Sequence, residues 1–229
     1  PKLIAGESES GAGVFTTDYF GETACLAQSP QLYKQLAVAG DLGGVYEVGP
    51  VFRAENSNTR RHLCEFTGLD FEVPIVSHYS EAISIGHGVF KAIFEGLESE
   101  CADLLQSVRT QFPSAKPVIS DEPVVLHFDD ALQLLRDAGL APEGGDDLSG
   151  ADELRLGELV KEKHGVDFFV VDRYPSSIRP FYTMLDPSDD TRSNSYDFFL
   201  RGQEICSGAQ RVHDPSLLRD QLRAPAASL

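Results

Sequence analysis

The segments VYEVGPVFRA (residues 45–54) and EFTGLDFEV (residues 65–73) are rich in β-branched and aromatic side chains, which favour β-strands. A polar loop from Glu55 to Leu63 lies between them. This loop is too short for the crossover that joins parallel strands, so the two segments predict an antiparallel pair.

Alternation along these strands decides which side chains share a face. Arg53 cannot lie on the same face as Phe52, and one face of the return strand carries Phe66, Gly68, Asp70 and Glu72. An arginine, a flat aromatic ring and two carboxylates suit a nucleotide together with an amine-bearing substrate, because the arginine fork matches phosphate or carboxylate. The alternative is a surface hairpin whose charges are solvated.

Elements on both sides of the pair predict an α+β fold with an antiparallel sheet flanked by helices. Further strands are expected at residues 14–15, 24–27, 166–172, 179–184 and 195–206. Helices are expected from Pro30, with Ser29 as N-cap, over 80–112, and from near Asp214.

Residues 114–165 differ from the rest of the chain in composition. Residues 114–164 hold 12 Asp/Glu against 5 Lys/Arg, around two short helical patterns near 129–138 and 152–164. We interpret 114–165 as a small acidic helical insertion that separates the first part of the core, 1–113, from its continuation, 166–229.

Composition bounds the class of protein. The chain has 229 residues, of which 41% are hydrophobic, enough for one large core. Taken alone, the net charge of -17 argues against nucleic-acid binding. A protein can nevertheless keep a small basic face within an acidic total, or carry its basic surface on a separate domain. No apolar run approaches the roughly 20 residues of a membrane span.

The four cysteines indicate a reducing compartment. They are widely spaced and form no C-x-x-C pair, which favours reduced thiols of a cytosolic protein over disulfides or metal ligands; they are Cys25, Cys64, Cys101 and Cys206.

Three further features carry polar groups in patterns that suit a binding site. Gln31 and Lys34 are three residues apart, hence on one face of a first helical turn. The small polar stretch from Ser8 to Gly13 is typical of a loop over a site or of an ordinary turn. The stretch GQEICSGAQR, residues 202–211, follows a strand pattern with an acid, a hydroxyl and a cation; each charge taken singly would be a solvated one.

These residues carry a family resemblance. The run VFRAENSNTRRHLCEF, residues 51–66, resembles motif 2 of class II aminoacyl-tRNA synthetases, in the form found in aspartate enzymes of the eukaryotic cytosol. LAQSPQLYKQ (26–35) resembles the segment after their flipping loop, and RPFYTM (179–184), SNSYD (193–197) and SGAQRVHD (207–214) resemble later blocks of the same subgroup. The resemblance covers essentially the whole chain in order.

The resemblance implies an ATP-dependent activation of L-aspartate and its transfer to the 3′ end of tRNA(Asp). It implies ATP binding by Arg53, Ala54, Glu55, Arg61, His62, Leu63, Phe66 and Glu204. It implies aspartate binding by Ser8, Glu9, Gln31, Lys34, Arg53, Asp70, Ser207 and Arg211. Arg53 would be the catalytic residue on the α-phosphate, Phe66 would stack on adenine, and Glu204 and Ser207 would bind Mg²⁺.

The resemblance also implies a cytoplasmic enzyme, a homodimer in the full-length parent, and partners in a multisynthetase assembly. Measured against the family, the dimer-forming part before Pro1 and the Gly-rich motif 3 beyond Leu229 are expected to be missing, so the chain alone is expected to be inactive in ATP–pyrophosphate exchange. Ser10 stands where the flipping loop would have glycine.

Two rival interpretations remain at this stage. One is an asparagine or non-discriminating enzyme of the same subclass. The other is a truncated, non-catalytic relative that binds a ligand or partner. The set Arg53, Glu204, Ser207 and Arg211 disfavours the second, because an inactive relative has no chemical reason to retain it.

Overall fold

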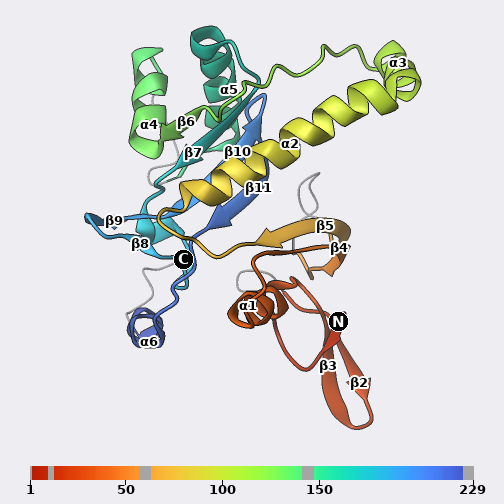
Figure 1. Ribbon diagram of the computed structural model, residues 1–229, viewed down its shortest axis with the longest axis vertical. Coiled ribbons are helices and arrows are strands. Elements are labelled where there is room, and N and C mark those ends of the chain that lie inside the picture. The colour runs from red at the N-terminus through yellow and green to blue at the C-terminus, as the bar shows by residue number, and fades with distance from the viewer. Residues whose placement is uncertain (1, 10–12, 57–62, 141–146, 224–229) are drawn as a thin grey trace. The chain divides into compact units, whose positions relative to one another are not determined.

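The computed structural model describes residues 2–9, 13–56, 63–140 and 147–223 (Figure 1). The chain divides into two compact units, residues 1–76 and residues 77–229. Both units combine antiparallel strands with helices, which agrees with the α+β class expected from the sequence. In the described ranges, no helix has both the length and the apolar character needed to cross a bilayer.

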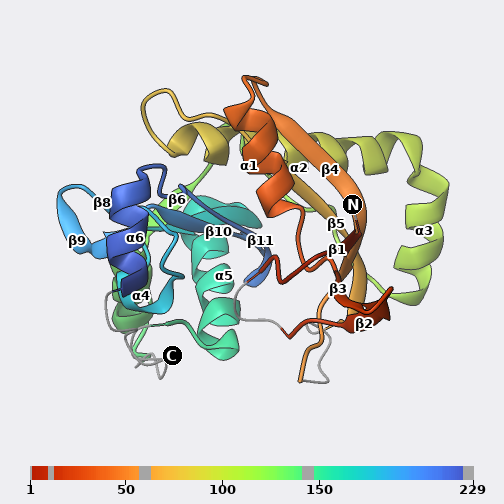
Figure 2. The same cartoon turned by 90° about the horizontal axis from the view of Figure 1, so that it is seen from below.

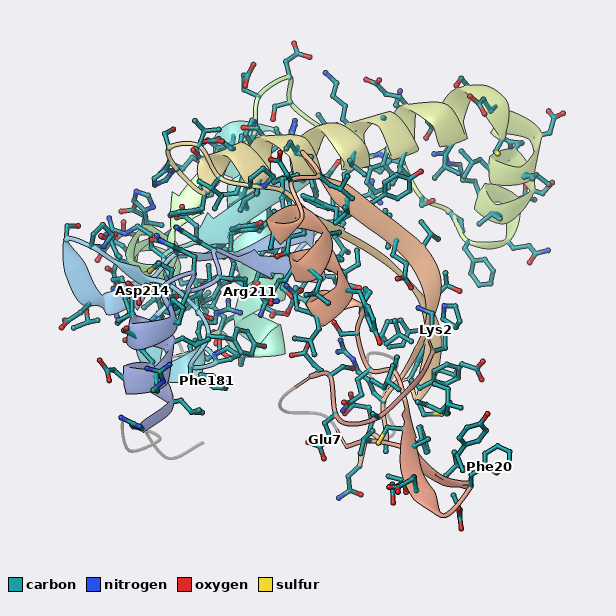
Figure 3. The ribbon with its side chains drawn as sticks, turned by 60° about the horizontal axis from the view of Figure 1, so that its bottom comes forward. Lys2, Glu7, Phe20, Phe181, Arg211 and Asp214 are labelled. Atoms are coloured by element: carbon teal, nitrogen blue, oxygen red, sulfur yellow. The ribbon has the colours of Figure 1, made fainter. Side chains whose placement is uncertain are left out.

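The first unit begins with a small antiparallel sheet of order β1-β3-β2, made of β1 (Leu3–Ile4), β2 (Thr16–Tyr19) and β3 (Glu22–Leu26). Phe20 and Gly21 join β2 to β3 with φ of 54° and 80°, the left-handed pair that a tight two-residue hairpin turn requires. The first strand of this hairpin was predicted at 14–15, whereas β2 begins at Thr16. Figure 3 labels Phe20 at this hairpin tip.

The strand pair of the first unit is the one predicted from the sequence. Strands β4 (Val45–Phe52) and β5 (Glu65–Glu72) are antiparallel, with Val51 opposite Phe66 and Glu47 opposite Asp70. Helix α1 (Gln31–Ala39) precedes them, and its N-cap is Pro30 instead of the expected Ser29. The Ser29 hydroxyl still accepts a hydrogen bond from the Gln31 amide, at 3.0 Å. This helix turns Gln31 and Lys34 to its buried side.

The second unit is built on a sheet of order β11-β10-β7-β6. Its strands are β6 (Val125–His127), β7 (Phe168–Asp172), β10 (Ser195–Leu200) and β11 (Gln203–Ala209). Its helices are α2 (Ser80–Glu100), α3 (Ala102–Gln111), α4 (Phe128–Asp137), α5 (Gly150–His164) and α6 (Pro215–Arg223). A 3-10 turn (Ser176–Ile178) and the ribbon β8 (Leu185–Asp186) and β9 (Asp189–Ser193) complete it.

Helices cover both faces of this sheet (Figures 1 and 2). On one face α2 lies so close that a β-carbon on Gly86 would be 2.7 Å from the Phe198 ring. On the other face α4 and α5 pack on Phe169 and Phe199, whose rings stack at 5.3 Å. Because both faces are covered, the central strands β7 and β10 are buried almost throughout.

Three expectations about the second unit were wrong. The helix over 80–112 is two helices that break at Cys101, whose φ of -120° is not helical. The strand over 195–206 is a hairpin, β10 and β11, because Arg201 and Gly202 adopt the positive φ of a tight turn. Residues 179–184 form no strand; only Thr183 makes an isolated antiparallel bridge, with Arg211.

The region 114–165 is integrated into the second unit. Its strand β6 extends the sheet by pairing parallel to β7, the one parallel pair among the described strands. Helix α5 approaches the β10–β11 turn so closely that a β-carbon on Gly157 would overlap the backbone nitrogen of Gly202. The division at 114 and 165 stays our proposal for the organisation of the chain.

Candidate functional site

Arg53 follows the last residue of β4 and continues its ladder. Its amide donates to the carbonyl of Cys64 at 2.9 Å, so its side chain lies on the face of Val51 and Phe66. The guanidinium carbon is 5.5 Å from the centre of the Phe66 ring. A cation and an aromatic ring therefore lie side by side, as the alternation along the two strands predicted.

The same face continues to a buried cation. Lys34 reaches from α1 into an ion pair with Asp70, and its ammonium lies 3.6 Å from a carboxylate oxygen of Glu72. The Lys34 side chain is 6% exposed, whereas that of Asp70 is 38% exposed. Gln31 donates from its amide nitrogen to Glu72 at 2.6 Å. A cation, two carboxylates and an amide thus form one connected group.

Ser8 and Glu9 are held by a residue that the sequence did not single out. The side-chain oxygen of Gln28 accepts hydrogen bonds from the amides of Ser8, at 3.0 Å, and Glu9, at 3.3 Å. Gln28 has no exposed surface. One sequence signal could have found it. Gln28 is a polar side chain between the end of β3 and the start of α1, where a buried side chain must form hydrogen bonds.

The remaining motif 2 residues differ in placement. The Ala54 amide donates to the carbonyl of Gly13 at 2.8 Å, which bridges this strand to the segment after Ser8 and Glu9. Glu55 is half-buried and Leu63 is 54% exposed at the ends of the motif 2 loop. Arg61 and His62 lie outside the described residues.

In the second unit a β-bulge decides how Glu204 and Ser207 lie. Residues three apart on a regular strand point to opposite faces. Here Phe199 pairs with Glu204 and Asp197 pairs with Ser207, so that Ile205 is an extra residue on β11. Because Phe199 and Asp197 share a face, the bulge puts Glu204 and Ser207 on one face as well.

Arg211 lies just beyond β11, on the segment that leads to α6 (Figure 3). Its guanidinium carbon is 4.4 Å from the centre of the Tyr182 ring. The backbone on both sides is tied to the same segment, since Val212 donates to Tyr182 and Met184 donates to Gln210, each at 2.9 Å. This arrangement orients the guanidinium fork by stacking.

The segment that carries Tyr182 begins at a buried ion pair. Arg179 donates to Asp197 at 2.5 Å, and its guanidinium stacks 4.0 Å from the centre of the Tyr174 ring. Burial raises the pKa of the Asp197 carboxyl, while the ion pair with Arg179 and the hydrogen bond from Tyr174 act in the opposite direction. The pair anchors residues 179–184 to the sheet.

The predicted residues therefore form one group in each unit. The first unit assembles Ser8, Glu9, Gln31, Lys34, Arg53, Phe66 and Asp70, with Ala54 and Glu55 next to them. The second unit carries Glu204, Ser207 and Arg211. Within the described ranges, no three His, Cys, Asp or Glu side chains gather in a way that could hold a metal ion without other ligands.

Comparison with known proteins matches residues 1–228 to the family model "tRNA synthetases class II (D, K and N)". The chain belongs to this family. The class II synthetase is 51% identical to aspartate–tRNA ligase 1, cytoplasmic, of Arabidopsis thaliana and 50% identical to the human cytoplasmic aspartate–tRNA ligase, over 97% and 96% of its length. It spans 42% and 44% of those two proteins.

Solved structures give the same result for the fold of this class II synthetase. The aspartyl-tRNA synthetase of Entamoeba histolytica superposes with a TM-score of 0.81 at 49% identity, over 86% of this chain and 40% of that one. The asparaginyl-tRNA synthetase of Pyrococcus horikoshii, complexed with asparaginyl-adenylate, gives 0.82 at 30% identity, over 97% of this chain and 50% of that one.

Proposed function

We propose that this chain supplies the amino-acid-activating site of an aspartate–tRNA ligase. In the first step a carboxylate oxygen of L-aspartate attacks the α-phosphorus of ATP, and pyrophosphate leaves as aspartyl-adenylate forms. In the second step the aspartyl group passes to the 3′-terminal ribose of tRNA(Asp), and AMP leaves. Identities of about 50% to cytoplasmic aspartate–tRNA ligases support this assignment.

One observation carries the proposal: the connected group of charges beside an aromatic ring on the inner face of β4 and β5. Lys34 is a buried cation that would face the substrate side chain, and Asp70 is the partly exposed carboxylate that would attract the substrate ammonium. Arg53, next to the Phe66 ring, would hold the α-phosphate while the ring stacks on adenine. Such chemistry depends on positioning and charge neutralisation rather than on a covalent nucleophile.

The group in the second unit is proposed to bind Mg²⁺, ATP and the substrate carboxylate. Glu204 and Ser207 offer two oxygen ligands on one face of β11. That number fits Mg²⁺, which keeps several waters and is held by one or two protein oxygens plus substrate phosphates. The ion would supply positive charge against the phosphates. Arg211 would grip the side-chain carboxylate of aspartate.

Aspartate and asparagine have nearly the same shape, so charge must separate them. A buried cation opposite a neutral amide loses a charge-assisted hydrogen bond, and polar mismatches of this kind give discrimination on the order of 10⁴-fold. Lys34 and Arg211 are the two cations proposed for this task. We therefore propose that these two residues select aspartate over asparagine.

Several wider features belong to the same proposal. The enzyme would act in the cytoplasm as a homodimer, with partners in a multisynthetase assembly. Residues 1–113 and 166–229 would form the catalytic core. The acidic region 114–165 would lie outside the ATP site and avoid tRNA, because its net charge repels phosphate. Crosslinks from tRNA into residues 140–155 would contradict this last point.

The assignment can be tested by binding and by activity. Isothermal titration calorimetry would compare the affinities of the purified chain for non-hydrolysable analogues of aspartyl-adenylate and asparaginyl-adenylate. Aspartate-dependent ATP–pyrophosphate exchange would be measured in a chimera in which this chain replaces the matching segment of the human cytoplasmic aspartate–tRNA ligase. We expect tighter binding of the aspartyl analogue and exchange that needs aspartate; preference for asparagine in both assays would refute the assignment.

Substitution of Lys34 makes the test specific. We expect Lys34→Met to weaken the aspartyl analogue by about 10- to 100-fold, the loss of one charge-assisted hydrogen bond, and to leave ATP binding unchanged. Lys91→Met is the matched control, because Lys91 forms an ion pair with Asp121 on the exposed side of α2.

A further inference from the structure

Gln28 joins three parts of the first unit through one side chain and its own backbone. The side chain is fully buried between β3 and α1, although it is polar. A buried amide needs partners for both ends, and here the oxygen accepts from two amides while the nitrogen donates to a carbonyl. The acceptor end faces Ser8 and Glu9, and the donor end reaches the Gly13 carbonyl at 3.2 Å.

The backbone of Gln28 extends this network toward Arg53. The Gln28 amide donates to the Ser8 hydroxyl at 3.1 Å, and its carbonyl accepts from the Nε of Arg53 at 3.4 Å. The Gly13 carbonyl, which Gln28 holds, also accepts the Ala54 amide at 2.8 Å. Gln28 is therefore connected to Ser8 and Glu9 on one side and to the start of the motif 2 loop on the other.

We propose that Gln28 is a positioning residue of the amino-acid site, which fixes the backbone of Ser8 and Glu9 relative to Arg53. The inference rests on the proposed function for the identity of the substrate, but not for the contacts themselves. Gln28 acts through Ser8, Glu9 and Arg53, which are the residues proposed to touch aspartate and the α-phosphate.

The chemistry of the amide explains why neither glutamate nor methionine would serve in its place. Glutamate would keep the acceptor for Ser8 and Glu9 but would turn a second acceptor toward the Gly13 carbonyl. Methionine has a similar length and no hydrogen-bonding group of comparable strength. A neutral side chain also adds no charge close to a site that takes a dicarboxylic substrate.

Amide hydrogen exchange on the purified chain tests the contacts without reference to any substrate. We expect the amides of Ser8 and Glu9 to exchange about tenfold faster or more in Gln28→Met than in the native chain, since each loses its acceptor. In Gln28→Glu their exchange should stay close to native. Gln35→Met is the matched control, because Gln35 lies on α1 beside the exposed side chains of Leu32 and Leu36.

Kinetics in the chimera then test whether the contacts position substrate. We expect Gln28→Met to raise the aspartate KM about tenfold or more and to leave the ATP KM within about twofold, because Ser8 and Glu9 are assigned to aspartate and not to ATP. Gln28→Glu should fall between the native chimera and Gln28→Met. An equal rise in both KM values would indicate general loss of structure and would overturn the proposal.

The two readouts separate the ways in which the proposal can fail. Native exchange at Ser8 and Glu9 in a folded Gln28→Met chain would disprove the contacts. Fast exchange with an unchanged aspartate KM would show that Gln28 is structural only. If Gln28→Met unfolds the whole first unit, amides within α1 will exchange fast as well, and Gln28→Glu then becomes the deciding variant. Fast exchange at Ser8 and Glu9 in Gln28→Glu, with native exchange in α1, would overturn the proposal. Absence of aspartate-dependent exchange in the native chimera would refute the proposed function and leave the hydrogen-exchange result standing.

Discussion

Arg211 offers the most direct test of how the substrate side chain is recognised. The proposed contact is a fork of two charge-assisted hydrogen bonds to the aspartate carboxylate, each contributing about 1.5–3 kcal/mol. Loss of both corresponds to about 3–6 kcal/mol, or roughly 10²- to 10⁴-fold in kcat/KM for aspartate. We therefore expect Arg211→Leu to lose aspartate activation by this factor while the ATP KM changes little.

The structure predicts a graded series around the same residue. Arg211→Lys keeps a charge but not the fork, so kcat/KM for aspartate should still fall by about 10- to 100-fold. Tyr182→Leu removes the ring that lies 4.4 Å from the guanidinium carbon. A cation–π contact of this kind contributes about 0.5–2 kcal/mol, so the aspartate KM should rise by about 2- to 30-fold.

Aspartate-dependent pyrophosphate exchange in the chimera would measure the series, with Arg219→Leu as control because Arg219 is exposed on α6. The expected order of loss is Arg211→Leu, then Arg211→Lys, then Tyr182→Leu. Arg211→Leu with kcat/KM for aspartate within about threefold of the native value would refute the assignment. That result would also favour the alternative of an asparagine enzyme.

Three predictions concern stability, measured by urea unfolding of the purified chain. Arg179→Met should cost about 3–5 kcal/mol, because it leaves the Asp197 carboxylate buried without its cation. Gly157→Ala should destabilise by about 1–3 kcal/mol because its β-carbon would overlap the β10–β11 turn, whereas Gly96→Ala, with open space around it, should stabilise by about 0.5–1 kcal/mol. For Asp167, burial raises the pKa, but hydrogen bonds from Val118 and Lys161 outweigh burial and lower the pKa below 3.8. Asp167→Asn should therefore reduce the unfolding free energy by about 1–3 kcal/mol above pH 3.8. This difference between native and variant chains should close as the pH falls further, because the native carboxylate then becomes protonated. Equal unfolding free energies in any native–variant pair, or a pH-independent difference for Asp167→Asn, would contradict the corresponding prediction.

The strand pair β4–β5 could be predicted from the sequence because its determinants are local. Composition indicates strands, loop length makes the pair antiparallel, and alternation then assigns Phe66 and Asp70 to one face. The β10–β11 hairpin was missed for an equally local reason. Its turn is Arg201-Gly202, and arginine with φ of 52° is not a residue that signals a tight turn.

The role of Gln28 could not be predicted, because its partners are distant in the chain. Ser8 lies 20 residues before it and Arg53 lies 25 residues after it. Periodicity reports only which side of an element is buried, and Gln28 belongs to no helix or strand. A polar residue at such a junction becomes informative only once its burial is known.

Glu204 and Ser207 show how a hypothesis about a site can conflict with simple alternation. Their spacing of three residues would put them on opposite faces of a regular strand and would argue against a shared ion. The extra residue Ile205 removes the conflict, because it shifts the register between Phe198 and Phe199. An irregularity in the ladder would thus allow one strand to offer the two oxygen ligands that we propose for one ion. Helix α5 packs against the turn of the same β10–β11 hairpin, where Gly157 lies close to Gly202. Helix α5 of the acidic region thus packs against the hairpin that carries the proposed Mg²⁺ ligands, which favours the structural role that we propose for the region.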